Sequence, residues 1–422
     1  MMAMLCYLNY SSSQQWQFEL PDHLKVFELK SPPPLLKVRD EIQKAVSDAL
    51  LNPYGLSLKE LFSRGEKILI VVDDHTRGTP AALVCDFLLK QAEMLGVSKE
   101  RLTVLIALGT HRPMTQEELK DKLGHAALSL RVVQHDAHGE FTDYGERDGI
   151  AVRLNPLIAE SDVLLAIGSI VPHRFCGWAG GAKILCPGVC AYETIAATHR
   201  QALLHEKIHL GMRENWFRSF MDWIGETVHL DFLVNFVPGL GGYHSVHAGE
   251  PGHVTKEGID AAMKASSIEL KEKVDCAIIS PYPSIRDLWQ SGKGFYIGET
   301  MLKDKGTLIL ATPLEEGIGD HPAFIGNLPN PLSEIKRSLE DPSMEDPLAL
   351  SVAYATRKIA DQFHLVLVTP HPQVQNMKIP GVEIFSDLQE AVKKEIVDKT
   401  SSSRAIETVA LVQDGYVLPY VV

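Results

Sequence analysis

The sequence predicts an α/β protein of two domains, each built on a mainly parallel sheet that helices cover. Continuous apolar runs such as 67–73 and 102–108 indicate strands buried on both faces, which is typical of parallel sheets. Helical spacing follows these runs, so strands and helices alternate along the chain. A second series of the same kind begins near Val274. This alternation predicts Rossmann-like domains, and we expect the active site in the cleft between them.

The length of 422 residues suits two or three domains of ordinary size. We expect an N-terminal α/β domain over 1–268 and a C-terminal α/β domain over 269–404. The tail 405–422 contains an apolar run, and we expect this tail to return to the first domain. The segment 261–270 is expected to cross between the two domains.

The elements of the N-terminal domain follow from their residue patterns. Alternating residues predict strands between Trp16 and Leu29, and the prolines at 32–34 predict a linker. Thr115 and Glu118 form a capping box, which predicts the start of a helix. The remaining patterns predict strands at 67–73, 102–108, 130–134 and 162–167, and helices at 36–51, 81–95 and 191–199.

The C-terminal domain shows the same kind of pattern with fewer strong signals. Apolar runs predict strands at 274–280, 306–311 and 363–369. The histidine-rich segment 244–253, which precedes this domain, is expected to be an ordered loop rather than a second metal site.

Composition excludes several classes of protein. A formal charge of −13, a pI near 5.7 and the lack of a basic run argue against a nucleic-acid-binding surface. No apolar stretch has the length that a membrane span needs, and the N-terminus lacks the basic residues of a signal peptide. The six cysteines are scattered, as in proteins that keep reduced thiols. We therefore expect a cytoplasmic protein without nucleic-acid or membrane partners.

Three of the predicted strands end in polar segments that contain histidine or arginine. The segments are DDHTRGTP at 73–80, GTHRPMT at 109–115 and GSIVPH at 168–173. In an open parallel sheet, ligands bind at the carboxyl ends of the strands. Three such endings in one sheet therefore indicate one shared site.

The third of these segments continues into a glycine-rich loop. Glycines cluster at 177, 180 and 181 and are followed by Lys183, while His173 and His199 flank the loop. Bare backbone N–H groups after a strand can approach an anion closely, which favours a cofactor loop. The spacing matches neither the P-loop nor the dinucleotide fingerprint, so a plain structural turn is equally compatible with the pattern.

Cysteines near this loop allow two interpretations. Cys176, Cys186 and Cys190 could join His173 in a Cys3His zinc site. The paired CxxC spacing of common zinc sites is missing, however, and this favours buried thiols that pack the loop.

These segments together resemble the lactate racemase family, whose members use a nickel-pincer nucleotide. The resemblance covers nearly the full length, and its strongest segments are 73–80, 109–115, VPHRFCGWAGGAKILCPG at 171–188, ETIAATH at 193–199 and DLWQSGK at 287–293. It implies an isomerase, a racemase or epimerase acting at C2 of a small 2-hydroxy acid. It also implies nickel and the nickel-pincer nucleotide as cofactors, and cofactor-biosynthesis enzymes as partners. Relatives act on various 2-hydroxy acids and sugar acids, so the substrate side chain stays open.

Individual residues match functional positions of this family. Lys183 matches the lysine that holds the pyridinium-type cofactor covalently through a thioamide, and His199 matches the imidazole ligand of nickel. His111 and His173 match the two acid/base histidines. The resemblance places Asp74, Gly180, Gly181 and Gly188 in the cofactor site, and Arg77, Gln290 and Lys293 beside the substrate carboxylate. It thus makes 1–268 the cofactor-binding domain. The chain departs from the family pattern at Trp178, Cys186 and Cys190.

The chemistry of a 2-hydroxy acid agrees with two histidines at one site. The C2 hydrogen is barely acidic beside a carboxylate, whereas its loss as hydride leaves a planar keto acid that can take hydride on either face. Histidine titrates near neutral pH and can accept the hydroxyl proton at the same time. Two other functions stay open: a nicotinamide-dependent 2-hydroxy acid dehydrogenase, against which the missing fingerprint counts, and a noncatalytic binding protein of the same fold, against which the intact histidines and Lys183 count.

Overall fold

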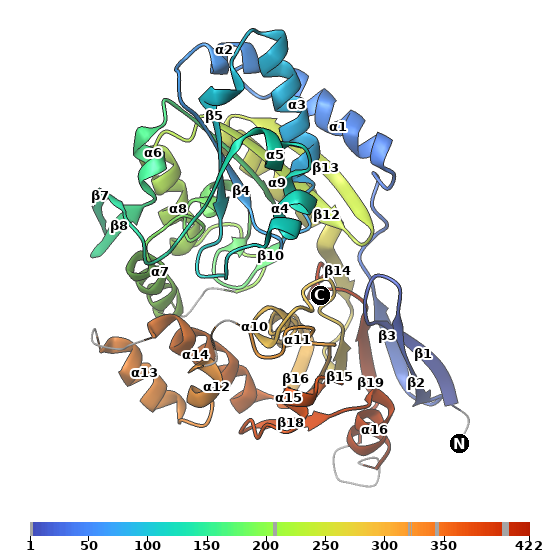
Figure 1. Ribbon diagram of the computed structural model, residues 1–422. Helices are drawn as coiled ribbons and strands as arrows, with labels where there is room; N and C mark the ends of the chain where they lie inside the picture. The colour runs from blue at the N-terminus through green and yellow to red at the C-terminus, as the bar shows by residue number, and fades with distance from the viewer. Residues whose placement is uncertain (1–2, 206–208, 320, 322, 342–345, 399–404) are drawn as a thin grey trace. The chain divides into compact units, whose positions relative to one another are not determined.

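The computed structural model describes residues 3–205, 209–319, 321, 323–341, 346–398 and 405–422 (Figure 1). The chain forms two compact units, one over Pro33–Ala265 and the other over Met1–Pro32 together with Ser266–Val422. Each unit contains a six-stranded sheet in which parallel pairs predominate, and helices accompany both sheets. The predicted α/β class is therefore confirmed. None of the described helices has the length and apolar character required to cross a membrane.

The unit boundaries differ from the predicted domains at both ends of the chain. Residues 1–32, predicted in the first domain, belong with the C-terminal unit, since β3 (Lys25–Leu29) pairs with β19 (Thr408–Val412). The predicted return of 405–422 to the first domain is wrong, because β19 also pairs with β15 (Val274–Ile279). The two edges of an apolar strand look alike in sequence, so its partners are chosen only when the sheet assembles.

The Pro33–Ala265 unit is organised by one six-stranded sheet. Its strands lie in the order β13 (Gly242–Gly249), β12 (Phe232–Gly239), β9 (Val163–Ser169), β4 (Ile68–Asp73), β5 (Leu102–Ala107) and β6 (Arg131–Gln134). All pairs are parallel except β12 with β13. Residues 68–72 of β4 are fully buried, which explains their continuous apolar run. The four strands predicted between 67 and 167 are confirmed.

Helices pack on this sheet through apolar side chains. One core cluster joins residues of α1 (Arg39–Leu51), α2 (Leu58–Phe62), α3 (Ala81–Met94) and α4 (Gln116–Leu123) to the strands. The predicted capping box is present, because the Thr115 hydroxyl accepts from the Glu118 N–H at 3.2 Å and the Glu118 carboxylate accepts from the Thr115 N–H at 2.7 Å. The unit also contains α5 (Ala126–Ser129), α6 (Pro156–Glu160), α7 (Tyr192–Leu204), α8 (Trp216–Thr227), α9 (Pro251–Ser266) and the hairpin β7 (Thr142–Arg147) with β8 (Ile150–Leu154).

The segment 244–253 is not the ordered loop that the sequence predicts. Its first residues belong to β13, which pairs with β12, and its last residues begin α9. The prediction failed because β13 lies at the edge of the sheet, where most of its side chains are only partly buried. A strand in this position does not need an apolar run.

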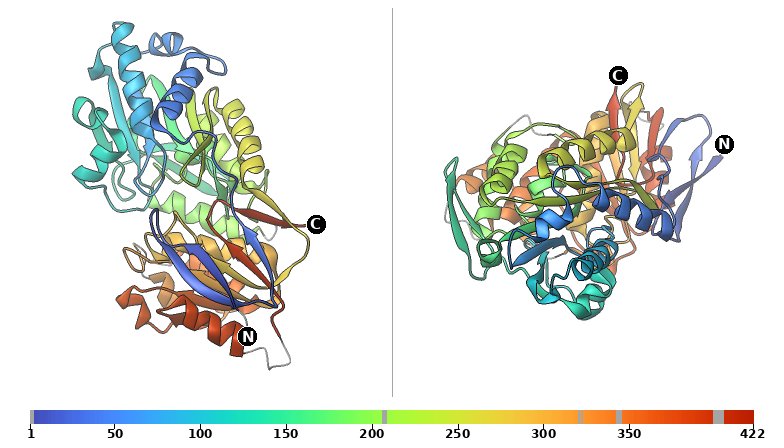
Figure 2. Two further views of the ribbon diagram at one scale, coloured as in Figure 1. Left: turned by 90° about the vertical axis from the view of Figure 1, so that its right-hand side faces the viewer. Right: turned by 90° about the horizontal axis from the view of Figure 1, so that it is seen from above.

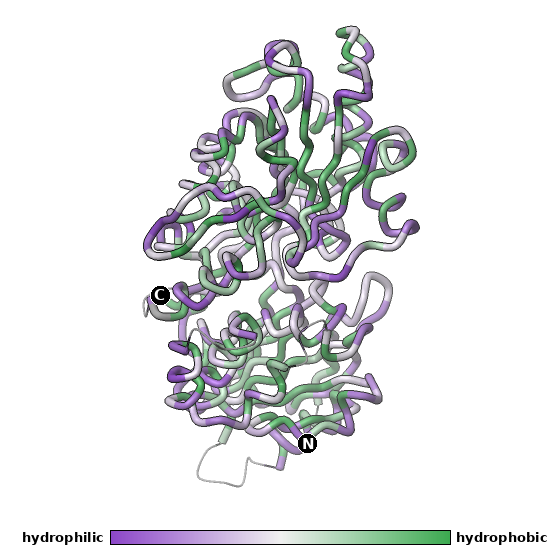
Figure 3. The backbone as a smooth tube through the Cα atoms, turned by 60° about the vertical axis from the view of Figure 1, so that its left-hand side comes forward, coloured by the Kyte–Doolittle hydropathy of each residue, from purple (hydrophilic) through white to green (hydrophobic). Residues whose placement is uncertain are grey.

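The other unit contains an all-parallel six-stranded sheet. Its order is β18 (Val382–Phe385), β17 (His364–Val368), β16 (Leu302–Ala311), β15, β19 and β3. The strands predicted at 274–280, 306–311 and 363–369 are confirmed. Figure 3 shows hydrophobic residues concentrated along the central strands of each unit.

Shorter elements complete this unit. The hairpin β1 (Ala3–Asn9) with β2 (Gln15–Pro21) packs against α16 (Leu388–Val392), and Figure 2 shows this N-terminal hairpin in blue. A two-stranded parallel sheet joins β14 (Ser267–Leu270) to β20 (Leu418–Val421). The remaining helices are α10 (Leu288–Ser291), α11 (Lys293–Met301), α12 (Ala323–Asn327), α13 (Leu332–Glu340), α14 (Pro347–Gln362) and α15 (Pro372–Gln375).

Candidate active site

The three polar strand endings lie side by side in the Pro33–Ala265 unit. Strand β4 pairs with β9 on one side and with β5 on the other, and all three run parallel. The segments 73–80, 109–115 and 168–173 therefore leave the sheet at the same edge (Figure 1). This arrangement confirms that the predicted endings share one edge.

Asp74 and His111 form a pair at this edge. The His111 Nδ1 atom lies 2.5 Å from the Asp74 Oδ2 atom, and the Asp74 carboxylate is 3% exposed. The other carboxylate oxygen accepts from the N–H and the hydroxyl of Thr76, at 2.9 and 2.5 Å. Burial opposes ionisation of Asp74, but the charge and hydrogen bond of His111 and the charge of Arg77 hold its pKa below the usual range. The pair therefore consists of an ionised carboxylate and an imidazole that it orients.

The loop after β5 is tied to the loop that carries Lys183. The Gly109 N–H donates to the Gly188 carbonyl at 2.9 Å, so two segments far apart in sequence meet beside His111. The predicted site residue Gly188 thus contributes a backbone acceptor. Its neighbours leave no room for a side chain, since a Cβ atom there would lie 2.0 Å from the Ile184 carbonyl oxygen.

Two glycines shape the backbone that precedes Lys183. Gly180 and Gly181 have φ values of +83° and +62°, which are accessible to glycine and strained for other residues. A Cβ atom on Gly181 would lie 2.7 Å from the Thr255 hydroxyl, and one on Gly180 would lie 2.3 Å from Ile170. The Gly181 N–H donates to the Asn235 side-chain oxygen at 2.8 Å. The loop is therefore a fixed cradle rather than a loose turn.

Lys183 follows this cradle in a short 3-10 turn, η2 (Gly181–Ile184). Its side chain is partly buried. Burial lowers the pKa of its amine, and the positive charges of Arg77 and Arg218 act in the same direction. A lowered pKa increases the fraction of neutral amine, which is the nucleophilic form of lysine.

Arg218 on α8 is a site residue that the sequence interpretation missed. Its guanidinium is 5% exposed and donates to the Gly180 carbonyl at 3.1 Å and to the Trp178 carbonyl. It therefore holds the backbone of the glycine-rich loop and contributes positive charge near Lys183. No sequence signal pointed to it, since Arg218 lies in an ordinary amphipathic helix.

His173 begins a tight hairpin, in which β10 (Pro172–His173) pairs with β11 (Gly177–Trp178). The chain turns back on itself there, so backbone N–H groups approach the imidazole. The His173 Nδ1 atom lies 3.3 Å from the Phe175 nitrogen, 3.4 Å from the Cys176 nitrogen and 3.2 Å from the Cys176 sulfur. The Cys176 side chain also affects the pKa of Lys183, which connects this hairpin to the lysine.

His199 projects from α7 between two aromatic rings. Its ring centroid lies 5.4 Å from that of Phe175 and 5.3 Å from that of Phe217, both in edge contacts. Its Nδ1 atom lies 2.8 Å from the Ile195 carbonyl oxygen one helical turn earlier. This hydrogen bond requires a proton on Nδ1 and leaves the lone pair on Nε2, the form in which histidine binds a metal.

Comparisons with known proteins place the chain in a family. A sequence model of the lactate racemase N-terminal domain matches residues 10–211. A lactate racemase from Thermoanaerobacterium thermosaccharolyticum is 30% identical over 319 residues, which cover 72% of this chain and 73% of that protein. The chain belongs to the lactate racemase family.

Two further comparisons extend over most of the chain. A lactate racemase from Lactiplantibacillus plantarum is 26% identical over 391 residues, which cover 88% of this chain and 89% of that protein. The structure of the lactate racemase apoprotein from T. thermosaccharolyticum superposes with a TM-score of 0.85 at 24% identity, covering 99% of this chain and 100% of that one. This similarity shows the same fold over the full length.

Arg77 lines a cavity of the protein. It has a volume of about 470 Å³ and is lined by residues of the 75–83 segment and of α4, among them His75, Arg77, Glu118 and Lys122. Lys122 is 7% exposed, forms an ion pair with Asp73 at 2.6 Å and donates to the Arg77 carbonyl at 2.9 Å. This missed lysine fixes the backbone from which Arg77 projects.

The predicted substrate residues Gln290 and Lys293 belong to the other unit. The Lys293 ammonium donates to the Gln290 side-chain oxygen at 2.7 Å, and the Asp287 carboxylate caps α10 by accepting from the Gln290 N–H at 2.7 Å. These two residues are thus placed next to each other, as the DLWQSGK segment suggested. Their approach to Arg77 across a cleft stays a prediction.

The three cysteines near the loop are all buried thiols. Cys190 donates to the Leu185 carbonyl at 3.3 Å, and burial together with a side-chain hydrogen bond with Cys186 raises its pKa well above the usual value. Cys190 therefore stays protonated, and the side chains of both cysteines are buried.

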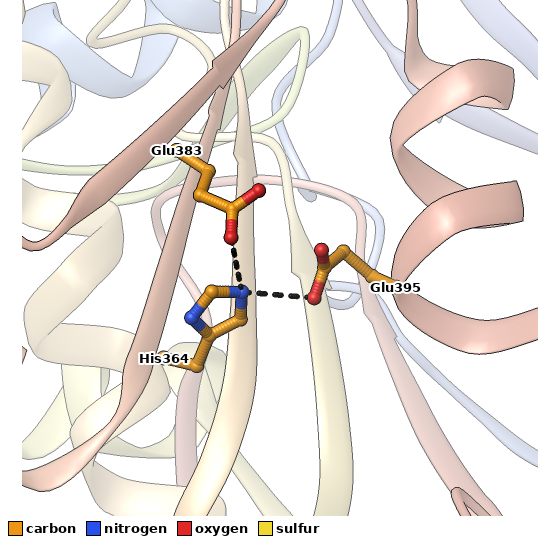
Figure 4. Close-up of side chains that lie close together, drawn as sticks. All are labelled: His364, Glu383 and Glu395. Atoms are coloured by element: carbon orange, nitrogen blue, oxygen red, sulfur yellow. Dashed lines mark ion pairs between the residues drawn. The ribbon is translucent and has the colours of Figure 1, made fainter. Parts of the chain in front are cut away.

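A separate cluster in the other unit joins one histidine to two glutamates (Figure 4). The His364 Nε2 atom lies 2.9 Å from Glu395 and 3.6 Å from Glu383, and Glu383 also pairs with Lys394 at 2.5 Å. Among the described residues this is the group of three possible metal ligands that lie within 4.8 Å of one another. Glu395 is fully buried, and a protonated His364 would supply the counter-charge that such a carboxylate needs. Such an ion pair is sufficient to account for this cluster without a metal.

Proposed function

We propose that the chain is a racemase or epimerase that interconverts the two configurations at C2 of a small, lactate-like 2-hydroxy acid. Hydride transfer to and from a nickel-pincer nucleotide would carry the reaction, with His111 and His173 as acid and base. The observation that best supports this proposal is the Asp74–His111 pair at the same sheet edge as Lys183, whose pKa is lowered. Membership of the lactate racemase family supports it independently.

The residues present fit the proposed cofactor. Gly180 and Gly181 form a cradle without side chains, and Lys183 beside it offers an amine of lowered pKa for covalent attachment. The nickel-pincer nucleotide, when bound, supplies the acceptor and donor of hydride. His199 would be the protein ligand of nickel through Nε2, because its Nδ1 donates to Ile195. Gly188 would line the same site through its backbone.

The remaining residues would bind and orient the substrate. The Arg77 guanidinium can hold a carboxylate through two parallel hydrogen bonds. His111 would accept the hydroxyl proton at Nε2, and Asp74 would stabilise the imidazolium that forms. Lys293 and Gln290 are proposed to contact the substrate carboxylate from the other unit, and closure of the two units would exclude water.

Two other functions have less support. A nicotinamide-dependent dehydrogenase would require a dinucleotide-binding turn after β4, where this chain has DDHTRGTP without the glycine fingerprint. A noncatalytic binding protein would not need a buried Asp74–His111 pair or a lysine of lowered pKa. Burying these ionisable groups lowers the free energy of unfolding, and a noncatalytic protein would have no functional reason to keep them buried.

Mass spectrometry of the intact protein tests the proposal. The chain should be produced with the enzymes that make the cofactor, and the expected result is a mass increase that Lys183→Ala abolishes. Lys256→Ala is the matched control, because Lys256 is an exposed lysine on α9 of the same unit. The protein that carries the cofactor should racemise a 2-hydroxy acid. Retention of the added mass in Lys183→Ala would show that another residue carries the cofactor.

A further inference from the structure

We propose that the two histidines of the site are held in opposite tautomers, and that Cys176 is the residue that positions His173. The inference describes the resting chain and gains its catalytic meaning from the racemase function proposed above. It follows from the hydrogen-bond partners of the two Nδ1 atoms, one a carboxylate oxygen and the other a set of donors.

His111 carries its proton on Nδ1. The atom that faces this nitrogen is an oxygen of Asp74, and an ionised carboxylate only accepts hydrogen bonds. In the neutral ring the lone pair therefore lies on Nε2. Nε2 is therefore the atom at which His111 would accept a proton from a substrate hydroxyl. In this step the O–H bond breaks, an N–H bond forms, and the imidazolium stays paired with the Asp74 carboxylate.

His173 shows the reverse arrangement. Two backbone N–H groups, those of Phe175 and Cys176, point at its Nδ1 atom, and a backbone N–H can only donate. If Nδ1 carried a proton, that proton would lie opposite the hydrogens of both N–H groups. The lone pair therefore lies on Nδ1 and the proton on Nε2. The hairpin that begins with β10 favours this tautomer, because it places the two N–H groups against the ring.

The side chain of Cys176 also favours the Nε2–H tautomer of His173. Its sulfur lies 3.2 Å from His173 Nδ1 and 3.0 Å from the Trp178 carbonyl oxygen. Burial raises the pKa of this thiol, so it stays an S–H donor rather than a thiolate that would attract a proton to the ring. The S–H donates to the Trp178 carbonyl, which also accepts from Arg218, and the same proton can be shared with the imidazole nitrogen.

The two histidines are consequently suited to different tasks in the resting chain. His111 presents a lone pair and acts as the base, whereas His173 presents an N–H group that can donate to a substrate oxygen. For His173 to accept a proton at Nε2, its Nδ1 must first become a donor. That change requires the contacts with Phe175 and Cys176 to open. The hairpin therefore biases which histidine acts first.

Nitrogen NMR on the full chain without cofactor tests this inference directly. Long-range proton–nitrogen correlation in a histidine-labelled sample distinguishes the Nδ1–H and Nε2–H tautomers of each ring. His111→Gln and His173→Gln provide the assignments. We expect the Nδ1–H form for His111 and the Nε2–H form for His173. The same tautomer at both residues, or Nδ1–H at His173, would overturn the inference.

Substitutions at Cys176 test the positioning role. Cys176→Ala should shift the His173 signals toward a mixture of tautomers, and Cys176→Ser, which keeps a donor, should restore the Nε2–H form. Cys85→Ala is the matched control, since Cys85 is also a fully buried thiol and lies in α3. Unchanged His173 signals in Cys176→Ala would show that the Cys176 side chain does not position His173. These readouts need no turnover, so a chain with opposite tautomers but no racemase activity would contradict only the proposed function.

Discussion

Replacement of Asp74 by asparagine tests the central pair of the site. One carboxylate oxygen accepts two hydrogen bonds from Thr76, and the other faces His111 Nδ1. Asparagine keeps one acceptor oxygen, which Thr76 would retain, so the amide NH2 would face Nδ1. Two donors cannot face each other, and the His111 proton would move to Nε2. The ring would then be unable to accept the substrate proton.

The magnitude follows from this change of tautomer. General acid–base groups contribute about 10² to 10⁴-fold, so we expect Asp74→Asn to lower kcat by that range while cofactor mass and nickel content stay normal. Loss of a buried hydrogen bond to a charged group should also lower the free energy of unfolding by about 1.5–3 kcal/mol. Because the Asp74 pKa is lowered in the folded state, this stabilisation is complete above the unfolded value near ~4 and is lost as pH falls below it.

The assay is racemisation followed by chiral chromatography, combined with thermal or denaturant unfolding at several pH values. Asp121→Asn is the control, since Asp121 is an exposed carboxylate of the same unit. A loaded Asp74→Asn protein with kcat within roughly threefold of the parent, far from the 10² to 10⁴ range, would refute the assigned role of Asp74.

Three further predictions concern other parts of the site. His199→Ala should lose nickel, measured by elemental analysis, whereas His111→Ala and His173→Ala should keep nickel and lose turnover; an equal loss of nickel in all three would indicate a different ligand set. Arg218→Met should destabilise the chain by about 1.5–3 kcal/mol or more and reduce cofactor attachment, because two carbonyls of the cradle lose their donor; normal attachment would contradict its role. Lys293→Ala should raise KM and shift X-ray scattering toward an open form when substrate is present; parental closure and turnover would contradict the predicted cleft.

Local patterns were sufficient to predict many of the strands of both sheets. The apolar runs that became β4, β5 and β9 were recognisable because each is buried on both faces. Strand β12 is equally buried and was missed, although its apolar run was a usable signal. The polar endings that hold Asp74, His111 and His173 could be named in advance, since parallel strands present their carboxyl ends at one edge.

Contacts between distant segments could not be predicted in the same way. The sequence named Asp74 and His111 separately, but their hydrogen bond exists because β4 and β5 are neighbours in the sheet. Arg218 and Lys122 gave no signal, because a buried cation on a helix looks in sequence like an exposed one.

The sequence by itself determined the α/β class, many of the sheet strands and the candidate catalytic and binding residues at the strand endings. The tertiary structure decided which strands pair, and thereby assigned both ends of the chain to the unit of β15. It also decided the hydrogen-bond partners of His111 and His173, and with them the tautomer of each ring. The physical reason is that hydrophobic periodicity is a property of a single segment, whereas a hydrogen bond depends on where a second segment places its donor or acceptor.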